Sequence, residues 1–270
     1  MSENTMLKVN EHGHLVVGGC DTVELAQKHG TPLYLYDEEA IRSRCREYIT
    51  EFGSRYPNVE IAYASKAALT KGFARLMEQE GMALDVASAG ELYTALQADF
   101  PSERIKMHGN FKSNLEYRMS LETGVGRIVV DSLIELQQLN CWAHKMGTPA
   151  NILIRVRPGV DTHTHDRIQT GQVDSKFGLG IYGGEARDAI WRALESDSIN
   201  LRGLHCHIGS QLLETDAFER AIDHMVEFLA RMHEELGFEC EDLDLGGGLG
   251  IRYTEKDEPP TVADLAETIC

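Results

Sequence analysis

The sequence has no excess of positive charge and no long apolar run. Its 270 residues carry 26 lysines and arginines against 43 aspartates and glutamates, which gives a formal net charge of −17. Since no stretch is strongly basic, we expect no nucleic acid among its partners. No apolar run approaches the roughly 20 residues that a membrane helix requires, so we expect no membrane span.

Cysteines are few, and their spacing is not that of a metal site. Without a signal peptide, this pattern favours free thiols in a reducing cytoplasm. The hydrophobic content of 42% is ample for a packed core, and the length allows one large domain or two small ones. The six cysteines are Cys20, Cys45, Cys141, Cys206, Cys240 and Cys270.

From residue 59 onward, a short apolar strand followed by a helix recurs along the chain. Several of the helices open with a serine followed three residues later by a glutamate, as at Ser88, Ser113 and Ser132, which predicts capping boxes. Such alternation is typical of a parallel sheet with helices outside it. The predicted strands are 59–64, 83–87, 105–108, 128–130, 152–156, 204–208 and 243–245.

These seven units predict an α/β fold of the TIM type, an incomplete (β/α)8 barrel. A closed barrel of this kind has eight strands. A doubly wound open sheet is the alternative, but it would place a glycine-rich phosphate loop near the first strand. Here the glycine run follows the last predicted strand, at 246–250.

The first part of the chain has a different pattern. We expect a short helix from Asp21 to Gly30, a strand over 32–36, and a helix capped by Asp37. The helix after Asp37 carries an apolar stripe that runs from Ile41 to Phe52.

Lys66 stands where the first strand of the repeating pattern ends and a helix approaches. Active sites of parallel α/β proteins are built at this edge of the sheet. A lysine that leaves a dry strand loses hydration, which lowers the pKa of its amine and makes it a nucleophile. The alternative is an ordinary lysine that reaches from a strand end to water.

Glycines and histidines mark two later strand ends. The run at 246–248 allows several N–H groups to converge on one anion, and Ser210 could add a hydroxyl donor. A plain flexible loop is the alternative. His205 and His207 lie on the same side of one strand, where they could bind a metal, lie against an aromatic cofactor, or pack in the core. The residues at these spacings provide no further metal ligand. A lysine nucleophile, a phosphate loop and a flat-lying histidine together indicate pyridoxal phosphate.

Several motifs also resemble a known family, the fold-type III pyridoxal-phosphate decarboxylases, which have an alanine racemase-like barrel. Residues 63–67, 203–211 and 246–251 resemble its signatures for the cofactor lysine and the last strands. Residues 108–113 and 157–165, with 170–171 and 174–178, are similar to the diaminopimelate decarboxylases in particular. Arg157 departs from that subfamily, which usually has asparagine there.

The resemblance implies an activity and a set of site residues. The activity is the decarboxylation of meso-diaminopimelate to L-lysine, the last step of lysine biosynthesis, by a cytoplasmic homodimer that takes a small amino-acid substrate. Lys66 would hold the cofactor covalently, and His207 would stack on its ring. The implied cofactor-binding residues are Lys66, Asp85, Arg155, His207, Ser210, Gly246, Gly247 and Gly248.

The resemblance also implies that the enzyme is longer than these residues. Family members continue through an eighth strand with a Glu-Pro-Gly-Arg motif and a C-terminal β domain, neither of which occurs before Cys270. We therefore expect 1–37 to hold a strand that pairs with such a domain, and 38–270 to form the pyridoxal-phosphate barrel without strand eight. This portion alone is expected to be a poor enzyme.

The sequence leaves other functions open. A related decarboxylase could act on arginine, ornithine or carboxynorspermidine, because the residues that discriminate these substrates lie mostly outside the sequence. A non-catalytic homologue that binds pyridoxal phosphate belongs to a different class. The joint presence of Lys66, His207 and the glycine run argues against it. An alanine racemase-like activity fits residues 163–165 and 207–211 poorly.

Overall fold

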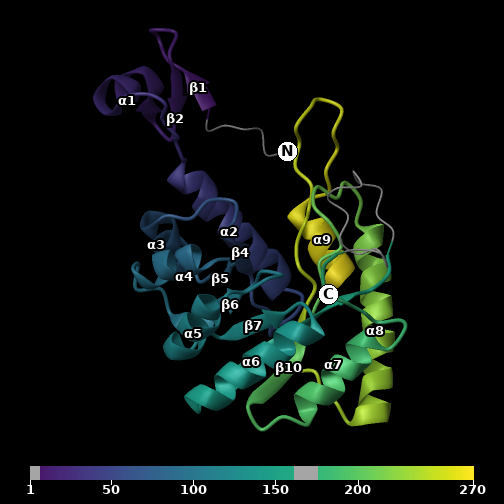
Figure 1. Ribbon diagram of the computed structural model, residues 1–270. Coiled ribbons are helices and arrows are strands. Elements are labelled where there is room, and N and C mark those ends of the chain that lie inside the picture. The colour runs from purple at the N-terminus through teal and green to yellow at the C-terminus, as the bar shows by residue number, and fades with distance from the viewer. Residues whose placement is uncertain (1–6, 161–175) are drawn as a thin grey trace. The chain divides into compact units, whose positions relative to one another are not determined.

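The computed structural model describes residues 7–160 and 176–270 (Figure 1). The chain divides into two compact units, Met1–Thr50 and Glu51–Cys270. The motif residues His163, Thr164, His165, Thr170, Gly171, Asp174 and Ser175 lie outside the described residues.

The first unit contains a small antiparallel sheet that the sequence analysis did not predict. Its strands have two or three residues each, too few to display an alternating pattern. The turn between the first two is built on Asn10, whose side-chain oxygen accepts hydrogen bonds from the N–H groups of His12 and His14. The sheet has the order β1 (Leu7–Val9), β2 (Leu15–Val17), β3 (Cys20–Asp21).

The two helices predicted near the N-terminus are confirmed. The carboxylate of Asp21 caps α1 (Thr22–His29) by accepting from two backbone N–H groups, and Gly30 ends the helix. Asp37 precedes α2 (Glu38–Gly53) and accepts from the N–H of Ala40 at 3.1 Å.

The strand predicted over 32–36 is not present in this structure. A strand exists only where a neighbour takes its backbone hydrogen bonds, and here Tyr34 is 86% exposed. Its predicted pairing with a further domain stays a prediction.

The second unit is built on a parallel sheet with the spatial order β11-β10-β8-β7-β6-β5-β4, and a short β9 pairs with β8. All of these strands pair in parallel, which confirms the predicted incomplete barrel with β4 and β11 at its edges. The strands are β4 (Ala62–Ala64), β5 (Ala83–Val86), β6 (Ile105–Met107), β7 (Arg127–Val130), β8 (Ala150–Arg157), β9 (Leu179–Gly180), β10 (Ile199–His205) and β11 (Asp242–Asp244).

Helices connect these strands and form an arc around the sheet (Figure 1). No helix in the described part of the chain is both long and apolar enough to cross a membrane. The helices are α3 (Lys71–Gln79), α4 (Ala89–Leu96), α5 (Asn114–Thr123), α6 (Leu133–Met146), α7 (Glu185–Leu194), α8 (Asp216–Leu236) and α9 (Val262–Ile269), with a 3-10 turn at Ser102–Arg104.

The predicted serine caps form, but only one is a reciprocal box. Ser113 and Glu116 bind each other's backbone N–H at the start of α5. At α4, Glu91 instead accepts from the N–H of Ala87 at 2.6 Å. At α6, Glu135 accepts from the N–H of Asp131 at 2.8 Å. These two glutamates therefore bind backbone N–H groups of the strand-to-helix loops, instead of the N–H of the serine cap.

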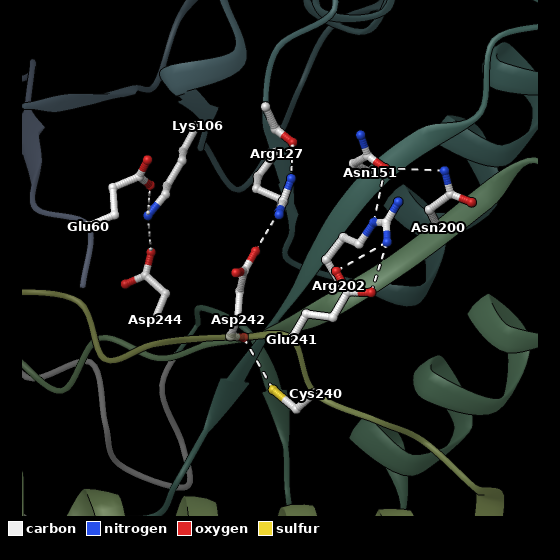
Figure 2. A network of polar contacts seen from close by, with 11 residues as sticks. Glu60, Lys106, Arg127, Asn151, Asn200, Arg202, Cys240, Glu241, Asp242 and Asp244 are labelled. Carbon is white, nitrogen blue, oxygen red and sulfur yellow. Dashed lines mark hydrogen bonds and ion pairs between the residues drawn. The ribbon is translucent and has the colours of Figure 1, made fainter. Parts of the chain in front are cut away.

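Ion pairs between distant strands show that the sheet is curled (Figure 2). Lys106 Nζ on β6 lies 3.5 Å from Asp244 Oδ2 on β11, although three strands separate them in the sheet order. Arg127 Nε on β7 donates to Asp242 Oδ2 on β11 at 2.6 Å. Such contacts require a concave face, so these side chains point into the barrel.

The opposite face of the sheet packs against the helices. Successive strand residues point to opposite sides, so the neighbours of Lys106 face outward. Ile105 and Met107 are fully buried, as are Leu84, Ile152 and Ile154. Burial of this apolar layer supplies the main driving force for the fold. The inner face carries the charged side chains of the strands together with a few apolar ones, such as Val129 and Leu153.

Candidate active site

The carboxyl ends of the strands bring most of the predicted site residues to one edge of the sheet. Register pairing places Arg155 of β8 beside His205 of β10, and His205 beside Asp244 of β11. Asp85 of β5 pairs with Ala64 at the end of β4. Asp85 and Arg155 therefore lie near the carboxyl edge of the sheet, and the other predicted cofactor residues follow the carboxyl ends of β4, β10 and β11, as expected for a parallel barrel.

Lys66 lies in the turn that follows β4 and is exposed. The turn is held to the sheet because the N–H of Ser65 donates to the carbonyl of Asp85 at 2.9 Å. The ammonium of Lys66 is close enough to His207 to disfavour a second positive charge there. The structure thus brings together the lysine and the histidine singled out by the sequence.

His207 is held as a neutral ring. Burial lowers its pKa to about 3, and the charges of His205, Arg155 and Lys66 act in the same direction. A neutral imidazole can lie against an aromatic ring without opposing a positive charge on it. His207 also touches the glycine loop, since a Cβ placed on Gly246 would meet its Nδ1 at 3.0 Å.

The loop after β11 packs tightly against the segment that follows β10. Gly248 has a φ of +117°, and a Cβ there would lie 2.0 Å from the carbonyl oxygen of Gly209. A Cβ on Gly246 would lie 2.5 Å from the carbonyl oxygen of Cys206. By contrast, no heavy atom lies within 4 Å of a Cβ built on Gly247, so that residue faces open space. The loop is thus fixed on one side and accessible on the other.

A short parallel bridge extends this pairing beyond the sheet. The N–H of Leu212 donates to the carbonyl of Gly248, and the N–H of Gly250 donates to the carbonyl of Leu212, both at 2.8 Å. The side-chain oxygen of Gln211 accepts from the N–H of Ile251 at 3.1 Å. Ser210, at the start of this bridge, lies beside the glycine loop, with its Cα 3.5 Å from a Cβ built on Gly248.

Asp85 and Arg155 have partners that the sequence did not reveal. Asp85 Oδ1 lies 3.4 Å from His108 Nε2. Arg155 lies 3.6 Å from the carboxylate of Asp131, and its guanidinium carbon is 4.7 Å from the centre of the Phe177 ring. Arg155 is thus oriented from two sides.

The carboxyl ends of β6, β10 and β11 also contribute a polar cluster. His108 and His205 meet edge to face with ring centres 4.9 Å apart, and His205 Nδ1 lies 3.1 Å from Asp244 Oδ1. Within the described residues, His108, His205 and Asp244 place potential metal-ligating atoms within 4.8 Å of one another. Sequence spacing could not reveal this group because its members come from different strands.

One signal in the sequence could have found these partners. Lys106 lies between two apolar residues of its strand, Asp244 lies between two leucines, and Asp131 directly follows an apolar strand. A charge at such a position must be paired within the fold, because burying it alone is costly. Arg157, which stands where the diaminopimelate decarboxylases usually have asparagine, is also paired within the fold. It donates to the carbonyl of Gly178 at 2.7 Å and to Glu185 at 3.1 Å.

Comparison with known proteins decides the family. The family model described as "Pyridoxal-dependent decarboxylase, pyridoxal binding domain" matches residues 38–270. The chain belongs to the pyridoxal-dependent decarboxylases. The cofactor of this decarboxylase domain is therefore pyridoxal phosphate, as predicted from the lysine, glycine and histidine pattern.

Relatives of this decarboxylase domain align with almost the whole chain. A diaminopimelate decarboxylase of Bacillus methanolicus is 49% identical over 97% of this chain and 61% of its own length. That of Bacillus subtilis is 46% identical over 96% of this chain and 59% of its own length. The crystal structure of diaminopimelate decarboxylase from M. jannaschii in complex with L-lysine has a TM-score of 0.90 and 39% identity, covering 98% of this chain and 62% of that one. The chain thus spans about three fifths of the length of these relatives.

The geometry of this decarboxylase domain fits its cofactor. The open side of Gly247 leaves room for an anion beside backbone N–H groups. Asp85 Oδ1 and His108 Nε2 are buried atoms that lie 3.4 Å apart, and neither makes a hydrogen bond within the described part of the chain. Polar atoms left in this way at a site are typical of positions that a ligand or water completes.

The histidine cluster of the decarboxylase domain suggests a test with a chelator. Dialysis of the purified enzyme against EDTA is expected to leave its activity unchanged. The ammonium of Lys106 already faces Asp244, so a metal ion there would meet a second positive charge. Activity and metal content are measured before and after dialysis. Activity that is lost and then restored by zinc would show that the cluster of His108, His205 and Asp244 binds a metal.

Proposed function

We propose that the chain contributes the pyridoxal-phosphate barrel of a diaminopimelate decarboxylase. The enzyme would remove the carboxylate at the D-configured carbon of meso-diaminopimelate and release L-lysine. The observation that carries this proposal is the convergence of Lys66, His207 and the open glycine loop on one edge of the barrel. The similarity to diaminopimelate decarboxylases over almost the whole chain supports the substrate.

Lys66 and His207 would hold the reactive part of the cofactor. Pyridoxal phosphate supplies an electron sink for the bond that breaks next to the substrate's amino group. The exposed amine of Lys66 would bind the aldehyde carbon, and the neutral ring of His207 would support the pyridine face. Because His207 carries no charge at neutral pH, it would not oppose a protonated pyridine nitrogen.

The remaining predicted residues would bind the phosphate and line the site. Gly247 and Gly248 would offer N–H groups to the phosphate, with Gly246 holding the loop and Ser210 adding a hydroxyl. Asp85 would stand beside the cofactor with its partner His108, and the orientation of Arg155 by Asp131 and Phe177 would fix its charge near the ring.

We also propose that residues 1–270 act within a longer polypeptide. The edges of the sheet, β4 and β11, would be joined by an eighth strand, and the segment 32–36 would pair with a β domain. A homodimer in the cytoplasm, implied by the family resemblance, completes the proposal. None of the six cysteines, all of which lie in the described residues, forms a disulfide, which is consistent with a reducing compartment.

A comparison of substrates tests this function. The purified enzyme with pyridoxal phosphate is expected to release L-lysine and carbon dioxide from meso-diaminopimelate. Its kcat/KM for this substrate should exceed that for L-ornithine, L-arginine or carboxynorspermidine by roughly a hundredfold or more, since the second amino-acid group offers polar contacts that these lack. Preference for another of the four would assign the related decarboxylase. Cofactor binding without turnover of any would favour the non-catalytic homologue.

A further inference from the structure

The carboxylate of Asp244 connects the barrel interior to the glycine loop. Asp244 ends β11, and its side chain is only 16% exposed. Its Oδ1 accepts a hydrogen bond from the N–H of Gly246 at 2.9 Å and lies 3.1 Å from His205 Nδ1. Its Oδ2 lies 3.5 Å from Lys106 Nζ (Figure 2). One carboxylate is thus held between β6, β10 and the loop after β11.

The surroundings of Asp244 keep it ionised. Burial alone would raise its pKa, but His205, Lys106 and His108 hold it well below its usual range. Lys106 responds in the opposite sense: burial favours the neutral amine, yet Asp244, Asp85 and Glu60 raise its pKa. A charged acceptor forms a stronger hydrogen bond with the N–H of Gly246 than a neutral one would.

The position of Gly246 matters for both parts of the proposed cofactor site. Gly246 has a φ of +69° and packs on the segment that carries His207. Gly247 and Gly248 follow it directly, so the direction of the Gly246 peptide sets where their N–H groups point. Loss of the hydrogen bond from the N–H of Gly246 to Asp244 would therefore displace the N–H groups of Gly247 and Gly248, the proposed phosphate cradle, more than the rest of the sheet.

We propose that Asp244 is a positioning residue that aims the glycine loop at the phosphate of the cofactor. It does so through the N–H of Gly246, while Lys106 and His205 hold its carboxylate in place. This inference rests on the proposed function, in which the loop binds the phosphate.

Asp242 provides a matched control on the same strand. It points to the same side of β11 as Asp244 and forms its own ion pair across the barrel, with Arg127 Nε at 2.6 Å (Figure 2). Asp242→Asn therefore weakens a similar interaction, while Gly246 keeps its charged acceptor. Asp244→Asn places an amide where two donors, the N–H of Gly246 and the ammonium of Lys106, both face a carboxylate.

The experiment compares two ligands that differ only in the phosphate. Dissociation constants of pyridoxamine 5′-phosphate and pyridoxamine are measured by fluorescence for the purified enzyme and both variants, each after removal of the bound cofactor. Asp244→Asn should weaken binding of the phosphorylated ligand by about tenfold or more, the scale of a charge-assisted hydrogen bond, and leave pyridoxamine within about twofold. Asp242→Asn should change neither. If Asp244→Asn does not fold, Asp244→Glu, which keeps the charge but moves the carboxylate, should show the same selective loss.

The outcomes separate this inference from the function on which it rests. A wild-type enzyme that does not prefer the phosphorylated ligand would overturn both the phosphate cradle and the role of Asp244. A wild-type preference that survives in Asp244→Asn or Asp244→Glu would overturn only the role of Asp244. Equal weakening of both ligands would show a general structural effect and would also overturn it.

Discussion

Replacing Lys66 by alanine is expected to abolish covalent attachment of the cofactor and to lower kcat by a factor of roughly a thousand or more, as removal of a nucleophile does. The reason is geometric. Lys66 is exposed in the turn after β4, and its charge is one of those that lower the pKa of His207, the proposed support of the cofactor ring. Borohydride reduction of the wild-type enzyme, followed by peptide mapping, should place the pyridoxyl group on Lys66.

Other lysines of the barrel are engaged elsewhere and make useful comparisons. Lys112 is 5% exposed and donates to two backbone carbonyls and to Glu135. Lys106 is paired with Glu60 and Asp244. The matched control is Lys71→Ala, which removes an exposed lysine at the first position of α3 and should keep full activity. A pyridoxyl label on a lysine other than Lys66 in the wild-type enzyme would refute the assignment.

The order of strands and helices could be predicted because its signals are local. Helices α1 and α2 form where their caps predicted them, and Ser88 and Ser113 cap helices where expected. Each of these elements depends on residues within a few positions in the chain. In parallel βα units, the position of a strand end also fixes the edge to which its side chains belong. The sequence alone could therefore predict that Lys66, His207 and the glycine run lie at the same edge of the sheet.

The interior of the barrel could not be predicted in the same way. The partner of Lys106 is Asp244, and the partner of Arg127 is Asp242, each on a strand far along the chain. These pairs exist only because the sheet curls, and no local pattern records curvature. Glu135 shows the same limit on a smaller scale. Its position after Ser132 indicated a capping box. Instead, its carboxylate pairs with the distant Lys112 and accepts from the N–H of Asp131.

Replacing Gly248 by alanine is expected to destabilise the fold by roughly 3 kcal/mol or more and to weaken cofactor binding. Its φ of +117° disfavours any side chain, and the new Cβ would lie 2.0 Å from the carbonyl oxygen of Gly209. Because that neighbour is backbone, the loop must move away from the segment after β10. The movement would also break the hydrogen bond from the N–H of Leu212 to the carbonyl of Gly248.

Gly247→Ala is the matched control, one residue away in the same loop. Its Cβ would meet no heavy atom within 4 Å, so the free energy of unfolding should stay within about 0.5 kcal/mol of the wild type. Urea unfolding of both variants measures the difference, and titration with pyridoxamine 5′-phosphate measures the loss of affinity in Gly248→Ala. Equal stability of the two variants would mean that the loop after β11 is not held against Gly209. The glycine run would then be a plain flexible loop, and the preformed phosphate cradle would have to be abandoned.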